Sequence, residues 1–469
     1  MKEKLLNFKE MIKKYNNILV NNIYKFINKY NIWIYFIIIT ILAVVARIVV
    51  FNKISGDVNG FIFNWYENLY NEGFSALGKQ NGDYTPAYNY YLFSLSLFRI
   101  EPKSNTLLYF IKIYSVLFDF GVAIIASLII YKLTDGNKIK TVLAYALTIM
   151  GLTVILNSAW WGQCDSIYAF FSLCAIYFFL MKKQRTAMIF IGLSFCFKLQ
   201  TIFILPVFII AMLRKEYKFR YLIWIPIIYI IMCIPACFAA NSFFDRLKEC
   251  LLVYVNQTGN SYKQLSLNAG TLYTIIFTNF KEELGLSSMA IPFAVAVIGT
   301  FIFIHFRTKK ELNNLLYFKL FALYSLLVPF MLPHMHDRYY YISDVLIPLY
   351  ALINVKKFYV AILSVTNSLI GYMVFLWNIP FFGVVPQDGS ITDGTKAMSF
   401  RFGGILCLIA IIIITIDLYK ELKDGNDEGK EIENEIKKEE IEDKDNVEVI
   451  IDEKVEDNVI TENIMNSNI

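Results

Sequence analysis

The sequence predicts an all-α fold: a polytopic transmembrane helical bundle with about twelve crossings and a large first extracytoplasmic loop. Three observations support this prediction. Hydrophobic residues make up 57% of the 469 residues and lie in apolar runs instead of amphipathic patterns. Several runs approach the roughly 20 residues that a helix needs to cross the hydrocarbon core. Basic residues gather between alternate runs, as the positive-inside rule requires of inner loops.

The apolar runs give the expected crossings in order. They are Ile32–Phe51, Leu107–Tyr131, Val142–Leu156, Ile167–Leu180, Ala187–Phe197, Thr201–Leu213, Tyr221–Ala239, Met289–Ile304, Leu315–Leu332, Tyr339–Leu352, Tyr359–Trp377 and Phe402–Ile416. Several are shorter than a full span. Residues 187–213 fit either two short helices that meet at Lys198 or one long tilted helix, so the count can change by one.

The distribution of lysine and arginine predicts the orientation. With the N-terminus in the cytoplasm, every inner loop is basic. The residues concerned are Lys132, Lys138, Lys140, Lys182, Lys183, Arg185, Arg214, Lys215, Lys218, Arg220, Arg307, Lys309, Lys310, Lys356, Lys357, Lys420 and Lys423. We therefore expect a multi-pass integral protein of a bacterial-type plasma membrane, with both termini cytoplasmic.

Charge separates a basic body from an acidic tail. The net charge of +5 divides into −12 for residues 421–469 and +17 for the rest. The tail has 18 acids, 6 lysines and no aromatic residue, a composition typical of disordered chain. We expect a basic cytoplasmic segment at 1–31, a transmembrane domain at 32–418 and an acidic, disordered cytoplasmic tail at 419–469. Because the basic residues of the body flank helix ends, they do not indicate nucleic-acid binding.

The unusual polar motifs all fall on the predicted outer side. The first outer loop, residues 52–105, contains SGDVNGFIFNWYENLY and NGDYTPAYNYYLF. Later outer turns contain WWGQCDSIY, FKLQ, QLSLNAGTLY and LPHMHDRYYYISD. A membrane-embedded outer cavity would bring these motifs together. The seven cysteines have no metal-ligand or disulfide spacing, and we expect neither a metal nor a cofactor.

In this order the motifs resemble those of the GT-C glycosyltransferases. The series is Gly56-Asp57 with Trp65-Tyr66, Asp83-Tyr84-Thr85-Pro86, Gly162-Gln163-Cys164-Asp165, Lys198-Leu199-Gln200 and His336-Asp337-Arg338-Tyr339. More narrowly, residues 32–418 are similar to bacterial relatives of the GPI-anchor mannosyltransferases and to the dolichol-pathway glucosyltransferases. The resemblance implies a GT-C bundle that transfers a hexose, such as mannose or glucose, with inversion, from a polyprenyl-phosphate sugar at an outer cavity. It also implies that the base is an acid in the first outer loop, which by position is Asp57.

The residues themselves suit this chemistry at Asp57. Glycosyl transfer needs a carboxylate that accepts the proton of the acceptor hydroxyl. Asp57 lies just beyond a predicted helix end and is followed by aromatic residues, among them Trp65 and Tyr66, which suit a sugar-binding surface. The alternative is a loop or helix-capping aspartate before Asn59.

Two other acids are candidates for catalysis. Asp83 lies in NGDYTP, between Gly82 and Pro86, and this composition equally indicates a turn. Asp165 lies at a predicted helix start, where a carboxylate can cap free amides and suits the positive end of the helix dipole.

Cationic side chains could bind the phosphate of the leaving group. Arg338 with His334 and His336 forms a compact set of donors in one outer turn. Lys198 is a possible second cation; the structural alternative is a snorkelling or helix-breaking lysine at a hairpin tip. The resemblance adds Gln200 beside it as a substrate-binding residue.

Inside the second predicted span, Asp119 must be paired or protonated to be tolerated, and Lys112 lies on a similar face. An internal pair with another helix is the structural explanation.

Two other functions remain open. A transporter or lipid flippase would also be polytopic, although such proteins often have internal repeats, and we find none here. A scaffold could act through the acidic tail. For the enzyme, the expected partners are a polyprenyl-phosphate sugar donor, membrane lipid, and a lipid-linked, glycan or protein acceptor.

Overall fold

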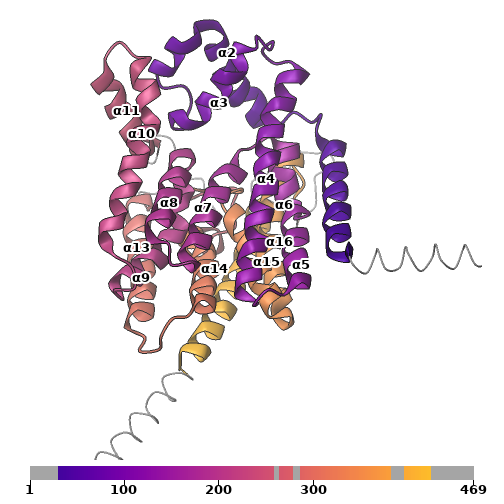
Figure 1. Cartoon of the computed structure of the whole chain (residues 1–469), viewed down its shortest axis with the longest axis vertical. Helices are drawn as coiled ribbons and strands as arrows, with labels where there is room; N and C mark the ends of the chain where they lie inside the picture. Colours follow the sequence, from indigo (N-terminus) through magenta and orange to yellow (C-terminus); the bar gives the residue numbers. More distant parts are fainter. Residues whose placement is uncertain (1–29, 258–263, 278–285, 382–395, 424–469) are drawn as a thin grey trace, which may run out of the picture. The chain divides into compact units, whose positions relative to one another are not determined.

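The computed structural model describes residues 30–257, 264–277, 286–381 and 396–423 (Figure 1). The predicted segments 1–31 and 419–469 lie almost wholly outside the described residues. The chain divides into a larger unit, Met1–Phe306 with Asn313–Ile414, and a smaller unit, Arg307–Leu312 with Thr415–Ile469. In the smaller unit, Nζ of Lys310 donates to the carbonyl of Glu421 at 2.7 Å.

The described residues are almost entirely helical, in agreement with the all-α prediction. The first helix is Tyr30–Val50 and the last is Lys396–Lys423. Between them come the short helices η1 (Val58–Ile62), η2 (Gly73–Gly78), η3 (Leu156–Trp161), η4 (Leu199–Ile204), η5 (Phe219–Ile223) and η7 (Val355–Lys357). The α-helices are α2 (Phe63–Glu72), α3 (Pro86–Leu97), α4 (Asn105–Leu133), α5 (Lys138–Ile149), α6 (Leu152–Ile155), α7 (Asp165–Leu180), α8 (Gln184–Phe197), α9 (Leu205–Leu213), α10 (Trp224–Phe238), α11 (Phe243–Asn256), α12 (Leu272–Ile276), α13 (Ser287–Arg307), α14 (Asn314–Met331), α15 (Tyr341–Ile353) and α16 (Phe358–Trp377).

Each of the twelve predicted crossings coincides with helical structure, but twelve crossings are not confirmed. Seven helices are long and apolar enough to span a membrane, and an eighth span exists if α5 and the segment Leu152–Trp161, bent by 45°, are counted together. The remaining apolar helices have 10–17 residues. They are shorter than the roughly 20 residues of a full span, so length alone does not assign them as crossings.

The helix starts follow local sequence signals. The hydroxyl of Ser104 accepts from the amide of Leu107 at the start of α4, and Asn137 caps α5 in the same way. Pro86 occupies the first turn of α3, where its missing amide hydrogen costs nothing. Gly151 begins the second half of the bent pair, and the bend lies at this residue and Met150. These caps and breaks therefore set where the polar segments lie.

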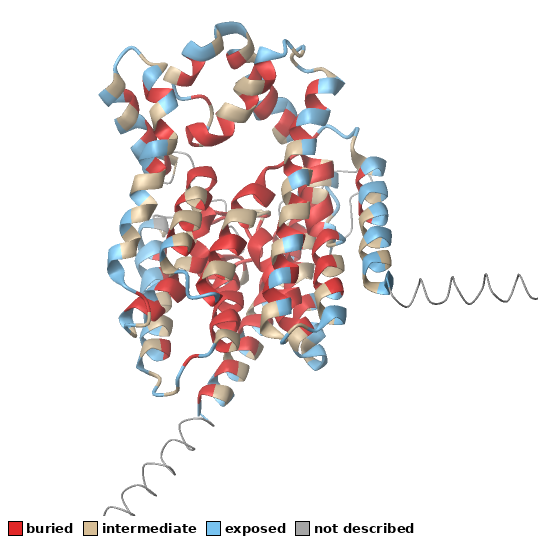
Figure 2. Ribbon diagram, in the orientation of Figure 1, coloured by how far each residue is buried: buried red, intermediate tan, exposed pale blue. Residues whose placement is uncertain are grey.

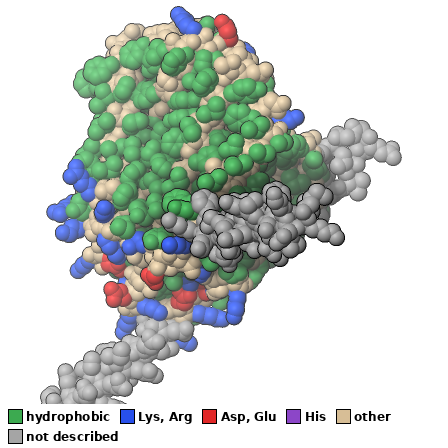
Figure 3. All heavy atoms as spheres, turned by 45° about the vertical axis from the view of Figure 1, so that its right-hand side comes forward, with side chains coloured by type: hydrophobic (Ala, Val, Ile, Leu, Met, Phe, Trp, Pro, Cys, Tyr) green, Lys and Arg blue, Asp and Glu red, His purple; other side chains and the backbone are tan. Residues whose placement is uncertain are grey.

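Burial is concentrated in the middle of the bundle (Figure 2). Within the apolar 18-residue stretch of each helix, 89% of the residues are buried in α14, against 11% in Tyr30–Val50 and 17% in Ser288–Arg307. The peripheral helices expose large hydrophobic side chains, and these cover a broad part of the face seen in Figure 3. An exposed apolar surface of this extent is what a lipid-facing protein requires.

A buried ion pair attaches the first helix to α4. Arg47 Nη2 lies 2.9 Å from Oδ2 of Asp119, and both side chains are almost fully buried. Ser158 and Tyr341 also donate to this carboxylate. Asp119 is thus paired with another helix, as expected, and its partner is Arg47.

Two local departures from helical structure contribute residues to one cavity. The chain breaks at Lys198, whose backbone is extended (φ −150°, ψ 144°), so residues 184–213 form two helical segments and not one long helix. The short strands β1 (Ser266–Leu267) and β2 (Met335–His336) pair in parallel, with Leu267 opposite His336. Both features present polar side chains to one cavity.

Candidate active site

A cavity of about 210 Å³ collects most of the predicted site residues. Its wall comes from η1 and α2, the turn before α3, the η3–α7 junction, the break at Lys198, α11, β1, the β2–α15 turn and α16. The lining residues are Asp57, Phe61, Ile62, Trp65, Asp83, Tyr84, Gln163, Lys198, Leu199, Gln200, Tyr254, Gln257, Leu267, Asn268, His336, Arg338, Tyr339 and Phe375. Segments far apart in sequence thus meet in one cavity.

Asp57 lies at the start of the helical turn that leads into α2, but it does not cap that turn. The side chain of Ser55 does so, because its Oγ accepts from the amide of Val58 at 3.1 Å and donates to the carbonyl of Trp161 at 2.6 Å. No side-chain cap is formed by Asp57. The capping explanation of Asp57 is therefore wrong, and its carboxylate lines the cavity.

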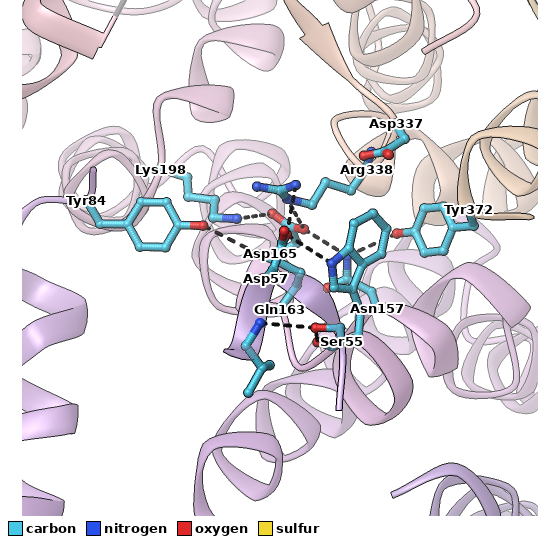
Figure 4. A network of polar contacts seen from close by, with 12 residues as sticks. Ser55, Asp57, Tyr84, Asn157, Gln163, Asp165, Lys198, Asp337, Arg338 and Tyr372 are labelled. Atoms are coloured by element: carbon cyan, nitrogen blue, oxygen red, sulfur yellow. Dashed lines mark hydrogen bonds and ion pairs between the residues drawn. The ribbon is translucent and has the colours of Figure 1, made fainter. Parts of the chain in front are cut away.

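One oxygen of Asp57 is held by protein donors. Nε1 of Trp161 lies 3.0 Å from Oδ2 and Nε2 of Gln163 lies 2.5 Å from the same atom. Nη1 of Arg338 approaches Oδ2 at 3.5 Å. Within the described chain no hydrogen bond involves Oδ1. The carboxylate is therefore fixed through one oxygen, while the other can accept a proton from a ligand (Figure 4).

Gly162 allows this arrangement. Its backbone is left-handed (φ +78°), and an added Cβ would come within 2.6 Å of a methyl group of Val58. The turn Gly162-Gln163 can thus lie directly against η1 only because residue 162 is glycine. This close approach brings the amide of Gln163 to Asp57.

Lys112 fixes the segment that leads to Asp57. Its Nζ donates to the carbonyls of Phe51, Lys53 and Trp160 at 2.9, 2.5 and 3.1 Å. These carbonyls belong to the segment after the first helix and to η3. Lys112 therefore joins the two segments that supply Asp57 and its donors.

Arg338 lies between two carboxylates. Besides its contact with Asp57, its Nε lies 3.7 Å from Oδ2 of Asp165. The guanidinium also lies 5.5 Å from the ring centre of Trp161, within cation–π range. These contacts hold the guanidinium of Arg338 at the cavity wall.

Asp165 and Lys198 form a buried ion pair at the cavity wall, which Lys198 lines. Lys198 Nζ lies 2.5 Å from Oδ1 of Asp165, and the side chains are 3% and 1% exposed. Asn157 donates to Oδ2 of Asp165 at 2.8 Å and to the hydroxyl of Tyr372 at 3.0 Å. Lys198 is therefore an ion-paired cation and not a snorkelling lysine, and its extended backbone agrees with the helix-breaking alternative. Asp165 begins α7 but is engaged by Lys198 and Asn157, and its helix has no side-chain cap.

The surroundings keep Lys198 charged and Tyr84 protonated. Burial lowers the pKa of Lys198, but Asp165, together with Cys164 and Tyr84, raises it, and the pKa lies well above its ordinary value. Burial raises the pKa of Tyr84 to about 12, although Lys198 acts in the opposite direction. The phenol can therefore donate, and its hydroxyl lies 3.5 Å from Oε1 of Gln163.

The β2–α15 turn separates the predicted phosphate-binding set. His336 and Arg338 line the cavity. His334 does not; its backbone is left-handed (φ +64°), and its Nδ1 lies 2.6 Å from the carbonyl of Gln264. Burial, together with the charges of Arg338 and Lys198, lowers the pKa of His336 well below its ordinary value. His336 is thus a neutral imidazole, and the compact three-residue set is reduced to Arg338 with one neutral neighbour.

Of the predicted site residues in the first loop, some line the cavity and one does not. Trp65 lines the cavity and packs against Gly82, where an added Cβ would meet the indole at 2.2 Å. Asp83 follows in this turn; its side chain is exposed at the cavity rim. Tyr66 lies outside the cavity, fully buried, and donates to the carbonyl of Ile100 at 2.6 Å. The positions of Tyr66 and His334 therefore give no support to a direct contact with substrate.

Several residues of the network were not among the predicted site residues. Trp161 and Gln163 were inside a quoted motif, so a signal for them was present. Lys112 stood out only as a charge in the second predicted span, and Asn157 and Tyr372 carried no signal, because single polar residues in apolar helices do not reveal which helix they face.

Two grooves adjoin the cavity. One is apolar and shares Leu199 and Tyr254 with it; its other residues are Phe195, Ile225, Pro226, Tyr229, Leu251 and Val255. The other is polar and shares Asp83 and Gln257; its other residues are Gln80, Gly82, Glu249, Val253 and Asn256. Arg246, almost fully buried, donates to Gln80 and Glu249 and so orders the wall of the polar groove. The cavity can thus receive an apolar and a polar group from different sides.

Among the residues that the structure describes, no three His, Cys, Asp or Glu side chains are grouped so that they could hold a metal ion. No protein-family model matches the chain, and no curated protein matches it significantly.

Proposed function

We propose that this protein is a membrane glycosyltransferase of the GT-C type that transfers a hexose, with inversion, from a polyprenyl-phosphate sugar to a hydroxyl group. The observation that carries the proposal is the carboxylate of Asp57, fixed through Oδ2 and open at Oδ1, beside a guanidinium in one cavity. Glycosyl transfer from a phosphate requires a base for the acceptor hydroxyl and a cation for the leaving phosphate, and this cavity has both.

In the proposed reaction Oδ1 of Asp57 accepts the proton of the acceptor hydroxyl. The acceptor oxygen forms a bond to the anomeric carbon, and the bond from that carbon to the phosphate oxygen breaks. The electron pair of the broken bond leaves with the polyprenyl phosphate. A single displacement of this kind inverts the anomeric configuration. Trp161 and Gln163 hold the base in position throughout.

The leaving phosphate gains negative charge, and two cations are near enough to stabilise it. Arg338 offers a planar pair of donors suited to phosphate oxygens. Lys198 stays charged through Asp165 and adds a second positive charge on the cavity wall. In this scheme Asp165 positions Lys198 and is not the base, because its oxygens are engaged. Asp83, exposed at the rim, is the alternative base.

The apolar groove supports a lipid-linked donor. It opens onto the cavity at Leu199, next to Lys198, so a phosphate at the cation would direct its hydrocarbon tail into the groove. Its walls come from α8, α10 and α11, and α10 is part of Phe219–Phe238, an apolar helical stretch long enough to span a membrane. A nucleotide donor would not need such a groove.

The basic loops favour a cavity on the extracytoplasmic side of a bacterial-type plasma membrane, with both termini in the cytoplasm. In this arrangement the short helices α7, α8, α9 and α15 complete about twelve crossings, and residues 52–105 form the large first outer loop. The acceptor is then a lipid-linked, glycan or protein hydroxyl that is available at that face.

The test is to incubate the purified protein in nanodiscs with polyprenyl-phosphate mannose and polyprenyl-phosphate glucose and to measure released polyprenyl phosphate. Release from one of them, abolished in the Asp57→Asn variant, is the expected result. If the protein neither turns over nor binds any donor of this class, the proposal fails and a transporter becomes the better hypothesis.

A further inference from the structure

Gln200 presents a buried, unsatisfied amide oxygen at the cavity wall. The side chain is 8% exposed, and Oε1 makes no hydrogen bond with any described residue. It lies in η4, two residues after the break at Lys198, and lines the cavity. Buried polar atoms are almost always hydrogen-bonded in folded proteins, so an exception at a cavity wall points to a ligand.

The second glutamine beside the catalytic carboxylate provides a contrast. Gln163 uses its Nε2 on Asp57, and its Oε1 lies 3.5 Å from the hydroxyl of Tyr84. Its amide is therefore engaged at both ends by the protein. The nearest cation to Gln200 in sequence, Lys198, is engaged by Asp165. Gln200 thus keeps an acceptor for which its neighbours supply no donor.

The chemistry of the wall restricts what can satisfy this atom. An ionised phosphate oxygen has no hydrogen to donate to Oε1, and the proposed polyprenyl-phosphate hexose has no cationic group, so its sugar hydroxyls are the groups that can donate. A hydroxyl group donates and accepts, so it satisfies the amide even if the amide turns over by 180°. A neutral hydroxyl is therefore the group that fits.

We propose that Gln200 selects the transferred sugar by binding one of its hydroxyl groups. The inference rests on the proposed function and deepens it, because the sugar is attached to the phosphate and must lie next to Lys198. Aromatic residues on the same wall, Trp65 and Tyr254, offer apolar faces to the ring. Gln200 is a binding residue in this scheme and does not take part in proton transfer.

The test combines a change in the protein with a change in the donor. The donors are polyprenyl-phosphate mannose or glucose, whichever is turned over, and its 2-, 3-, 4- and 6-deoxy analogues. The proteins are the native chain, Gln200→Met, which removes the amide at similar size, and Gln200→Glu, which keeps an acceptor. The measurement is kcat/KM for release of polyprenyl phosphate, with monodispersity as the folding control.

One deoxy analogue should lose about tenfold or more in kcat/KM with the native protein, because a site that binds a hydroxyl rejects its absence. With the parent donor, Gln200→Met should lose a similar factor in kcat/KM. With that deoxy analogue, Gln200→Met and the native protein should have the same kcat/KM. Gln200→Glu should keep the discrimination; if Gln200 instead binds phosphate, the added charge would raise the donor KM strongly.

If the loss in kcat/KM caused by Gln200→Met multiplies with the loss caused by each of the deoxy analogues, Gln200 binds none of these hydroxyl groups. That result would overturn the inference and leave the proposed function intact. A native protein that releases no polyprenyl phosphate from either parent donor would overturn the proposed function and this inference with it.

Discussion

Nη1 of Arg338 lies 3.5 Å from Oδ2 of Asp57, at the long end of hydrogen-bond range. The loose contact orients the guanidinium without using its remaining amino group, because Nη2 makes no hydrogen bond within the described chain. Arg338 can therefore accept a phosphate while it stays next to the proposed base.

Replacing Arg338 by alanine should weaken donor binding. A charge-assisted hydrogen bond to phosphate is worth about 1.5–3 kcal/mol, or roughly 10- to 150-fold in affinity. Arg338→Lys keeps the charge but loses the planar pair of donors, so its affinity should lie between those of the native and alanine proteins. The measurement is a titration with the donor in nanodiscs. Unchanged affinity in a folded Arg338→Ala protein would remove this residue from the phosphate site.

Asparagine at position 57 separates proton transfer from binding. Asp57→Asn keeps the shape of the side chain but cannot act as a carboxylate base, so transfer should fall about 100- to 10,000-fold. Donor affinity should change only a few-fold. The measurement is transfer rate and donor affinity for the same preparation.

Asp83→Asn is the matched control, because it makes the same chemical change at the rim. It should retain far more activity than Asp57→Asn. The reverse order would move the base to Asp83, and a collapse of donor affinity in Asp57→Asn would make Asp57 a substrate-positioning residue.

The buried pair of Asp165 and Lys198 should be coupled in stability. Removing one partner leaves an uncompensated buried charge, which typically costs about 3–5 kcal/mol. Asp165→Asn and Lys198→Met should therefore each lower the melting temperature, and the double variant should be more stable than Lys198→Met with its charged Asp165. A double-variant loss equal to the sum of the single losses would show that the two residues do not act as a pair.

The helical framework could be predicted from sequence, because each apolar run predicts a helix in the bilayer and each basic loop predicts a connection on the inner side. The predicted segments Leu107–Tyr131 and Tyr359–Trp377 match α4 and α16 closely. The crossing count could not be predicted, since whether a 13-residue helix such as α15 spans the membrane depends on its neighbours and on local thickness.

The candidate site was predictable where chemistry is concentrated in short motifs. Asp57, Lys198 and Arg338 stand out because charged residues beside apolar runs are costly unless they have a role. The direction in which each side chain points was not predictable. One turn left His336 in the cavity and rotated His334 away from it, and no sequence period distinguishes these two residues.

A bulky side chain in the apolar groove should interfere with the donor. Ile225→Trp fills the groove between α8 and α10, and displacing about 60 Å² of apolar contact is worth about 1.5 kcal/mol, or roughly tenfold in donor KM. Ile231→Trp makes the same change on the exposed side of α10, outside the groove, and should leave KM unchanged. Equal KM values for the two variants would mean that the lipid tail binds elsewhere.

If the lipid occupies the apolar groove, the acceptor must enter through the polar one. Asn256 lines only the polar groove and is exposed, and the seven native cysteines are buried. In Asn256→Cys, modification by the impermeant trimethylammonium-ethyl methanethiosulfonate should reduce transfer to endogenous acceptor in membrane vesicles at least roughly tenfold, because a blocked groove prevents acceptor positioning. The donor KM should not change, since the reagent does not reach Lys198 or Arg338. Lys248→Cys, exposed on α11 and outside both grooves, is the control: its modification should leave transfer unaffected. If modified Asn256→Cys transfers at the unmodified rate, the acceptor uses another route; if its donor KM rises instead, the polar groove belongs to the donor.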